Sequence, residues 1–600
     1  MARPPKKTNG NGNGSSRALT TPQAVNAAIW SVCDILRRSA CTSALQYVPE
    51  LTWLLFLRIL DEQEQREAEN AEIVGSDFTP SLNEPYRWCD WAAPYDEKGD
   101  YPPVTAMGSR RGWLRHDQQN GSLGSFFAFV NGQLLPYLRG LARQPNATPR
   151  QKVIGQILSG VERTRIDTER NFADVLDKLD PIRLETTDPQ HVFILSQIYE
   201  GLLLRMGEKG NDGGQFFTPR QVIKAMVEVI HPRLGETLYD PSCGTGGFLA
   251  QAYQYLHERE VADNPAITPD RLDQLKHDTF YGREKENLIY PIALANLVVH
   301  GIDRPNLWHG NTLTGDVTYD RLFDTAPAQF DVILTNPPFG GKEGTDAQTR
   351  FDFKTGATQV LFLQHIIKSL KDGGRCGIVL DEGVLFRTNE TAFVQTKRKL
   401  LDDCDLWCIV SLPGGVFTAA GAGVKTNLLF FTKGSPTTRI WYYDLSALKV
   451  AKRQPLIFEE HFQDFMQRLP ERSDSERSWT VDFTARQRQA AEAAAPLKTQ
   501  AQQKTDEAAQ WKVRLNDLKR AKPRNFEAET AAQDRCQTLT KEARELSTQA
   551  QAIEDAAYDL KAVNPNVKTD QDARTPAELL DFIEAKGREV AAALERLRGG

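Results

Sequence analysis

The alternation of short apolar runs with helical stretches between residues 234 and 432 constrains the fold of this chain more than any other feature. The patterns at 286–300, 358–371 and 391–402 are helical. The apolar runs between them predict buried strands at Thr237–Asp240, Thr279–Glu284, Phe330–Asn336, Cys376–Asp381, Trp407–Leu412 and Thr426–Thr432. This order predicts an α/β domain with a doubly wound, mostly parallel sheet. Ligands of such sheets bind at the carboxyl ends of the strands.

Six hundred residues are too many for one core, and the rest of the chain has a helical or low-complexity pattern. A Gly, Asn and Ser run within residues 1–20 cannot bury apolar surface, so we expect disorder there. Residues 45–60 are apolar almost all round, which predicts a buried helix. The tryptophans at 88, 91 and 113 are expected to form core. We therefore expect an N-terminal helical domain over 21–175, the α/β domain over 176–480 and a helical tail over 481–600.

The tail contains a heptad seam. Its apolar residues are spaced alternately by four and three: Leu539, Ala543, Leu546, Ala550, Ile553, Ala557 and Leu560. A similar stripe of Trp511, Leu515 and Leu518 precedes it, and Pro523 separates the two. One interpretation is a helical hairpin packed on its own body, and the other is a seam for a helix of another subunit. Small seam residues permit close approach, which favours the second interpretation slightly.

Charge and cysteine usage exclude several classes of protein. Lys and Arg number 73 and Asp and Glu 79, a net charge of −6, so the chain does not grip nucleic acid by bulk charge, although a local basic groove remains compatible. The most apolar stretch, Leu51–Leu60, is too short to span a membrane and contains Arg58. Met1–Ser16 lacks the apolar core of a leader. The 8 cysteines show no zinc spacing, so we expect no metal, no disulfide and a cytoplasmic location.

The strongest local motif is Asn336-Pro337-Pro338-Phe339, at the end of a predicted strand. The exocyclic amino group of a nucleobase is a poor nucleophile because its lone pair is delocalised into the ring. The Asn336 side-chain oxygen and the Pro337 carbonyl could accept its two hydrogens, and Phe339 could stack on the base, worth roughly 1–3 kcal/mol. A plain strand end with a Pro-Pro turn has the same pattern.

A second motif, from Asp240 through the glycines at 244, 246 and 247, predicts a tight turn between a strand and a helix. It matches neither G-x-G-x-x-G nor a P-loop, so a dinucleotide or triphosphate is disfavoured. An acidic residue before the turn suits a ligand with an ammonium group. Glu284, at the end of the next strand, can bind ribose hydroxyls, and Asn311 after a third strand can meet an adenine amino group.

Two further segments flank these motifs. Upstream, Gln215-Phe216-Phe217-Thr218-Pro219 precedes a helix and could close over a methionine tail. Downstream, the polar loop Gly340–Thr355 follows Phe339 directly, and its Lys342, Arg350 and Lys354 are suited either to phosphates or to solvent.

Together these motifs fall in one order on successive strand ends. The set resembles the S-adenosylmethionine-dependent amino-methyltransferases of DNA, and most closely the modification (methyltransferase) subunit of type I restriction-modification systems, the gamma class of N6-adenine enzymes. The resemblance covers about residues 20–450 and includes Leu54–Arg58, Gly377–Phe386 and Ile409–Phe417. It implies a Rossmann-like methyltransferase sheet, an N-terminal helical domain and a coiled-coil-like C-terminal tail for subunit assembly.

The resemblance also implies roles for individual residues. The cofactor S-adenosyl-L-methionine would be bound by Gln215, Phe216, Phe217, Thr218, Pro219, Asp240, Ser242, Gly244, Thr245, Gly246, Gly247, Glu284 and Asn311. The flipped adenine would be held by Asn336, Pro337, Pro338 and Phe339, with Phe417 packing on its other face. Asn311 stands where related enzymes often have Asp.

The implied partners are double-stranded DNA, a specificity subunit and, through it, a restriction/translocase subunit, with two copies of this chain per complex and no membrane. No helicase P-loop or nuclease cluster is recognisable, so cleavage would need another subunit. Two other functions fit the motifs: methylation of a protein glutamine or of RNA, because an amide nitrogen suits the same acceptors, and a non-enzymatic role as a DNA-clamping assembly subunit.

Overall fold

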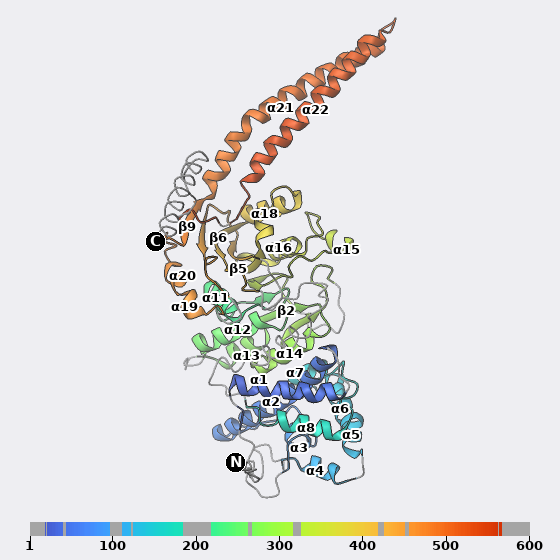
Figure 1. Ribbon diagram of the computed structural model, residues 1–600, viewed down its shortest axis with the longest axis vertical. Coiled ribbons are helices and arrows are strands. Elements are labelled where there is room, and N and C mark those ends of the chain that lie inside the picture. Colours follow the sequence, from blue (N-terminus) through green and yellow to red (C-terminus); the bar gives the residue numbers. More distant parts are fainter. Residues whose placement is uncertain are drawn as a thin grey trace, which may run out of the picture.

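The computed structural model describes residues 18–19, 21–39, 44–95, 111–121, 124–183, 218–261, 267–315, 326–417, 425–450, 455–561 and 563–566. Along the long axis, an N-terminal group of helices, a sheet domain and a projecting helical hairpin follow one another (Figure 1). Within the described ranges, no helix combines the length and the apolar character needed to cross a membrane.

The N-terminal domain is a helical bundle around buried aromatic rings. Residues 50–61 of α2 are buried on all sides, as expected from the sequence, and Trp53 stacks with Trp91 and Phe172 at centroid distances of 6.3 Å. The boundary expected at residue 175 falls inside α8, and Leu19 pairs with Ile182 beyond it. The helices are α1 (Pro22–Arg38), α2 (Ala44–Val74), α3 (Trp88–Trp91), α4 (Trp113–Gln119), α5 (Ser125–Phe129), α6 (Leu135–Gly140), α7 (Pro149–Ile157) and α8 (Glu169–Leu179).

The described strands form one mixed, mostly parallel sheet in the order β3-β2-β1-β4-β5-β7-β6-β8-β9. β7 and β9 run antiparallel to their neighbours. All six strands predicted from apolar runs are confirmed, as is the strand expected before Gly310, whereas β8 and β9 were not predicted. The strands are β1 (Leu238–Asp240), β2 (Phe280–Glu284), β3 (Asn306–His309), β4 (Phe330–Thr335), β5 (Leu370–Asp381), β6 (Cys404–Ser411), β7 (Thr426–Lys433), β8 (Arg439–Asp444) and β9 (Ser478–Asp482).

Helices cover both faces of the sheet, which confirms the doubly wound architecture. α11, α12 and α14 share one apolar core with the N-terminal bundle, and α16 and α18 pack in a second core on the opposite face. The helices of this domain are α11 (Arg220–Ile230), α12 (Gly247–Leu256), α13 (Pro269–His277), α14 (Ile289–Val299), α15 (Thr345–Gln348), α16 (Thr358–Ser369), α17 (Glu382–Phe386), α18 (Thr391–Asp403), α19 (Phe458–His461) and α20 (Gln463–Arg468).

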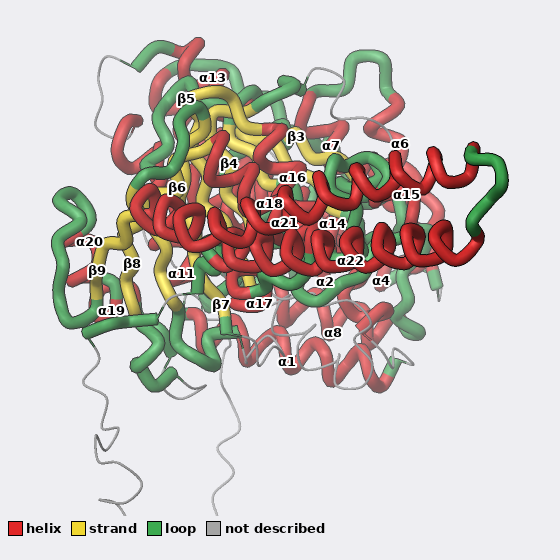
Figure 2. The backbone as a smooth tube through the Cα atoms, turned by 90° about the horizontal axis from the view of Figure 1, so that it is seen from above, coloured by secondary structure: helices red, strands yellow, loops and turns green. Residues whose placement is uncertain are grey.

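The tail is an antiparallel hairpin of α21 (Phe483–Arg520) and α22 (Phe526–Ala556), seen from above in Figure 2. Within the α22 seam, Leu539, Ala543 and Ala550 are buried against α21, and Leu546 and Ile553 are half-buried. The inward residues of α21 recur every seven positions: Ala494, Ala501, Ala508 and Leu515. The interpretation that favoured another subunit's helix for this seam is therefore wrong, because the chain covers the seam itself. Ala557 and Leu560 leave the hairpin and pack on the sheet domain. Residues 567–600 of the tail lie outside the described residues, as does most of 1–20, where we expected disorder.

Candidate active site

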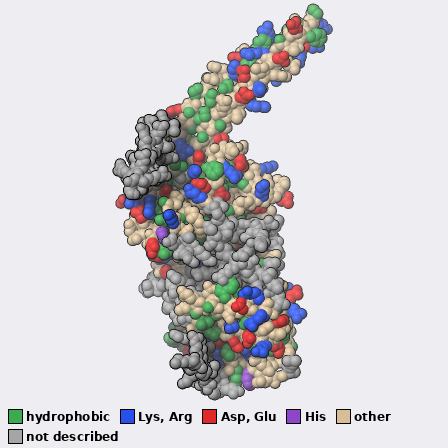
Figure 3. All heavy atoms as spheres, viewed as in Figure 1, with side chains coloured by type: hydrophobic (Ala, Val, Ile, Leu, Met, Phe, Trp, Pro, Cys, Tyr) green, Lys and Arg blue, Asp and Glu red, His purple; other side chains and the backbone are tan. Residues whose placement is uncertain are grey.

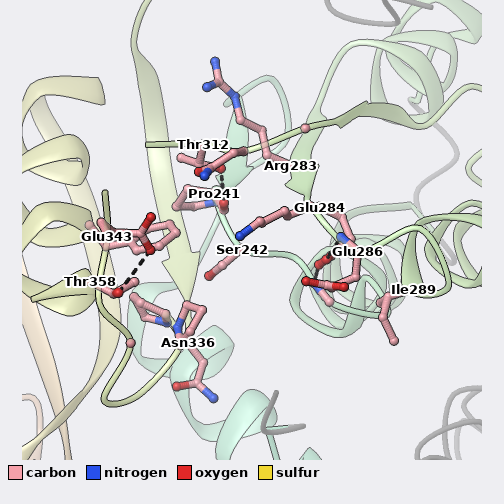
Figure 4. Close-up of a pocket in the computed structure, with 18 of the residues that line it drawn as sticks. Pro241, Ser242, Arg283, Glu284, Glu286, Ile289, Thr312, Asn336, Glu343 and Thr358 are labelled. Atoms are coloured by element: carbon pink, nitrogen blue, oxygen red, sulfur yellow. Dashed lines mark hydrogen bonds between the residues drawn. The ribbon is translucent and has the colours of Figure 1, made fainter. Parts of the chain in front are cut away.

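The carboxyl ends of β1, β2, β3 and β4 surround one cavity of about 300 Å³ (Figure 4). Ser242, Gly244, Glu284, Asn311 and the Asn336-Pro337-Pro338 segment all line it. A smaller cavity of about 40 Å³ adjoins it and shares Ser242, Gly244 and Asn336 with it. The smaller cavity is also lined by Thr218, Asp240, Thr245 and Gly247. The structure thus brings the glycine turn and the Asn-Pro-Pro segment, 96 residues apart from Asp240 to Asn336, into one site.

Backbone conformation explains two of the glycines in the turn. Gly244 and Gly246 have φ angles of 55° and 79°, a region that L-residues with a side chain rarely adopt. A Cβ atom on Gly246 would also lie 3.2 Å from the Leu297 side chain. The turn therefore brings β1 into the start of α12 with its backbone facing the cavity.

Asp240 is buried with one carboxylate oxygen left without a partner. Its Oδ1 accepts hydrogen bonds from the backbone N–H of Ser242 at 3.0 Å and from the Thr335 hydroxyl at 2.7 Å. Its Oδ2 is buried and accepts no hydrogen bond. Burial raises the pKa of Asp240 to about 7. A ligand carrying a positive charge would stabilise the ionised form and supply the missing donor.

Glu284 joins the end of β2 to the glycine turn. Its two oxygens accept hydrogen bonds from the backbone N–H groups of Gly244, at 2.9 Å, and Glu286, at 2.8 Å. Burial raises the pKa of Glu284 to about 7 as well. Asn311 lines the same cavity, and its side-chain oxygen accepts the Leu313 N–H at 2.9 Å.

Asn336 is held so that its acceptor atom is free. Its Nδ2 donates a hydrogen bond to the Thr218 hydroxyl at 3.0 Å, and its Oδ1 is buried with no hydrogen-bond partner. The Pro337 carbonyl accepts only a long contact from Gln359, at 3.5 Å. Two consecutive residues at the end of β4 thus carry oxygen acceptors, one without a partner and one with a long contact, and both are of the kind that an NH₂ group requires.

The aromatic pair does not form an open slot. Phe339 and Phe417 are both buried, and their rings meet at 89° with centroids 5.5 Å apart. Rings in perpendicular contact leave no space for a base between them, so stacking on both faces requires at least one ring to move. Thr218 and Pro219 lie at the start of α11, whereas Gln215, Phe216 and Phe217 lie outside the described residues.

The loop after Phe339 and helix α16 close one side of the cavity, which we call its roof. Lys342 and Glu343 of the loop after Phe339, and Thr358 and Phe362 of α16, line it opposite Glu286 and Ile289. The Thr358 hydroxyl donates to Glu343 Oε1 at 3.1 Å, so the loop is tied to α16 (Figure 4). The sequence pointed to the loop after Phe339 and its Lys342, and the four-residue spacing of Thr358 and Phe362 places both on one helix face. Arg350 and Lys354 are not among the lining residues.

The described part of the chain contains no group of three or more His, Cys, Asp or Glu side chains placed to hold a metal ion. Its seven described cysteines are all free thiols.

Comparisons with known proteins agree with this geometry. The family described as N-6 DNA Methylase matches residues 190–507, and the HsdM N-terminal domain matches residues 25–110. The EcoEI methylase subunit of a type I restriction enzyme, from Escherichia coli, is 35% identical over 446 residues, covering 73% of this chain and 81% of that protein. The corresponding EcoKI subunit of Escherichia coli K12 is 32% identical over 453 residues, covering 73% and 74%.

A solved modification subunit from Vibrio vulnificus YJ016 superposes with a TM-score of 0.62 at 30% identity, covering 78% of this chain and 94% of that one. A sheet of this order with these groups at its strand ends, together with these matches, defines an amino-methyltransferase that acts on DNA. The chain belongs to the N-6 DNA methylase family and, within it, to the methylase subunits of type I restriction-modification systems.

Proposed function

We propose that this chain transfers the methyl group of S-adenosyl-L-methionine to N6 of an adenine rotated out of duplex DNA. The proposal rests on one observation: the side-chain Oδ1 of Asn336 is buried without a hydrogen-bond partner, and Asn336 lines the same cavity as the glycine turn. Leaving a buried acceptor without a partner costs roughly 1–3 kcal/mol, and an N6 hydrogen would supply the missing donor.

The residues around the two cavities fit S-adenosyl-L-methionine. The free Oδ2 of Asp240 suits the ammonium group of the methionine portion, and Glu284 suits the ribose hydroxyls. The larger cavity, of about 300 Å³, is at the lower end of the range for small-molecule sites. When bound, the cofactor supplies an electrophilic methyl group on a sulfonium that leaves as a neutral thioether.

On the substrate side, the chain positions the nucleophile. The Asn336 oxygen and the Pro337 carbonyl each accept one N6 hydrogen, which draws the nitrogen lone pair out of conjugation with the ring. The N6–carbon bond forms as the sulfur–carbon bond breaks, and the extra proton on N6 leaves to water. Positioning supplies most of the rate, and rotating the base out of the duplex costs a few kcal/mol.

We place the activity in the cytoplasm within a complex. A specificity subunit would supply sequence recognition, and through it a restriction/translocase subunit would supply cleavage, with two methylase subunits per complex. Support comes from the relatives named as type I methylase subunits and from a type I R-M system structure with a TM-score of 0.57 and 31% identity, which covers 96% of this chain and 98% of that one.

The test is a crossed pair of substitutions in the complex with the specificity subunit. Asn336→Ala should keep S-adenosyl-L-methionine affinity by isothermal titration and slow methylation of duplex DNA by at least about 100-fold. Asp240→Ala should instead weaken cofactor binding. Asn120→Ala, at an exposed position in the N-terminal domain, is the matched control and should change neither.

Two results would contradict the proposal. Full methylation by Asn336→Ala would remove the amide from the reaction. Equal transfer to DNA whose target adenines already carry an N6 methyl group, or preferential transfer to protein or RNA, would identify a different acceptor.

A further inference from the structure

The outer end of the hairpin differs in charge from the rest of the molecule. Residues 511–526 comprise the last ten residues of α21, the turn and the first residue of α22. They contain one acid, Asp517, while the whole chain is net negative at −6. All the basic side chains of this segment are exposed. They are Lys512, Arg514, Lys519, Arg520, Lys522 and Arg524. We call this segment the basic tip, and Figure 3 shows that the outer end of the hairpin stands clear of the body.

The basic tip and the rest of the hairpin differ in ion pairing. We call the rest, residues 483–510 of α21 and 527–556 of α22, the shaft. On the shaft, Lys498 pairs with Glu554 at 2.5 Å and Lys504 with Glu542 at 2.9 Å, so lysines there hold the two helices together. In the basic tip, Arg524 pairs with Glu529, and the other five cations form no ion pair with any described residue. Charges that stabilise the hairpin are thus paired, and the charges of the basic tip are in excess.

Helix stability does not account for this excess. Lys519 and Arg520 lie in the last turn of α21, where cations interact favourably with the helix dipole by about 0.3–1 kcal/mol each. Lys512 and Arg514 lie two turns earlier, and Lys522 follows the helix end, so none of these three gains that stabilisation.

Two aromatic rings orient the arginines of the basic tip. Arg514 lies over Trp511 at 5.0 Å from its centroid, and Arg524 lies over Phe526 at 4.8 Å. A guanidinium stacked on a ring keeps its N–H groups available at the edge while losing rotamer freedom, which favours binding to planar or tetrahedral anions. Each of the two rings carries a guanidinium over one face, so this part of the surface presents cations suited to a polyanion.

We propose that the basic tip binds the phosphate backbone of duplex DNA outside the site occupied by the target base. A straight helix of 38 residues is about 57 Å long, so the basic tip lies far from the strand-end cavity. Contact there is independent of sequence, because phosphates carry no base information. The binding would add affinity for flanking DNA to whatever recognition another subunit provides.

The test compares two double substitutions that each remove two lysines from the same hairpin. Lys519→Gln with Lys522→Gln alters the basic tip, and Lys498→Gln with Lys504→Gln alters the paired shaft. The full chain is titrated onto a labelled duplex of about 40 base pairs, by fluorescence anisotropy, from about 50 to 200 mM salt. The assay requires no methyl transfer, so it is independent of the strand-end site.

The double substitution in the basic tip should weaken binding roughly tenfold and reduce the slope of log K against log salt by about 1.8, two phosphate contacts at about 0.9 each. The shaft substitution should leave both values unchanged, and circular dichroism should show both variants folded. Unchanged DNA binding by the basic-tip variant, or an equal loss in both variants, would overturn the proposal. Unchanged DNA binding with lost co-purification of the specificity subunit would overturn it in favour of a protein partner.

Discussion

The strand-end cavity and the shaft of the hairpin treat polar groups in opposite ways. In the cavity, Asp240 Oδ2 and Asn336 Oδ1 are buried without hydrogen-bond partners. On the shaft, lysines at the surface are matched with glutamates across the two helices, and the seam between the helices is mostly alanine. Unmatched groups destabilise the free protein, and Asp240 and Asn336 both line the smaller cavity, where a ligand would complete their bonding. Matched groups mark places where the chain supports only itself.

The largest effect that would test this comparison comes from a variant that keeps Asn336 but removes the hydrogen bond that orients its side chain. Thr218→Val keeps the shape of the side chain but removes the acceptor for Asn336 Nδ2, which leaves the amide free to rotate. We expect kcat for methylation to fall roughly 100-fold while cofactor affinity stays within about threefold. Thr218→Ser, which retains the hydroxyl, should restore most of the rate; equal rates in both variants would show that this bond does not orient the amide.

A second change tests the shaft by overfilling it. Ala501 is buried in the seam, so Ala501→Leu should destabilise the hairpin by about 1–3 kcal/mol, because a well-packed interface cannot absorb the extra volume. Thermal unfolding followed by circular dichroism measures the effect. Val513→Leu, at a position 62% exposed, is the control and should unfold like the parent. A seam that tolerated leucine would be loosely packed.

The pKa values of the cavity predict a pH dependence of cofactor binding. Burial raises the pKa of both Asp240 and Glu284 to about 7, so both carboxyls of the free protein are largely protonated at pH 6 and ionised at pH 8. An ammonium ligand prefers the carboxylate, so affinity for S-adenosyl-L-methionine should rise roughly tenfold across this interval. Isothermal titration at both values measures it, and Asp240→Asn should flatten the profile.

The same shifts act on stability with the opposite sign. A carboxyl whose folded pKa lies above its unfolded value binds its proton more tightly in the folded state. The stability that Asp240 contributes is therefore full below the unfolded pKa and is lost as pH rises through about 7. The melting temperature of the parent relative to Asp240→Asn, both without cofactor, should therefore fall between pH 5 and pH 8; a constant difference would contradict the raised pKa.

The smallest expected effect concerns one shaft ion pair. Lys498 and Glu554 lie 2.5 Å apart, but their side chains are 53% and 22% exposed, so solvent screens the pair. Lys498→Ala should cost about 0.5 kcal/mol or less. A larger loss, measured by urea unfolding, would mean that the shaft depends on its surface charges more than on its alanine seam.

Most of the sheet and the order of the site motifs follow from local sequence. The strands that carry the site are short apolar runs that end near Asp240, Glu284 and Asn336. Because ligands of such sheets bind at the carboxyl ends of the strands, the sequence alone predicts that these residues share a site. β8 and β9 were missed because neither fits the alternation of apolar runs with helical stretches: β8, Arg439–Asp444, follows β7 after a short turn with no helix between them, and β9, Ser478–Asp482, alternates polar with apolar residues at the sheet edge.

Contacts between distant segments were not predictable. The Asn336–Thr218 hydrogen bond joins residues 118 positions apart, and no pattern in either segment predicts a contact with the other. The roof formed by Glu343 and Phe362 depends on how one loop folds back over α16. The heptad seam showed that Leu539 and its neighbours would be covered but not which helix covers them, since an alanine seam accepts a helix from the same chain or from another equally well.

The hairpin is attached to the sheet domain at both of its inner ends. Asp482, the last residue of β9, is the N-cap of α21. The segment after α22 returns to donate the Leu560 N–H to the carbonyl of Leu385, in α17, at 3.1 Å. α17 in turn starts where β5 ends, at Asp381. The hairpin is thus anchored to the sheet domain at two points, one on the edge strand β9 and one on α17, the helix that follows strand β5. A displacement of its outer end would therefore act on the catalytic sheet at both points.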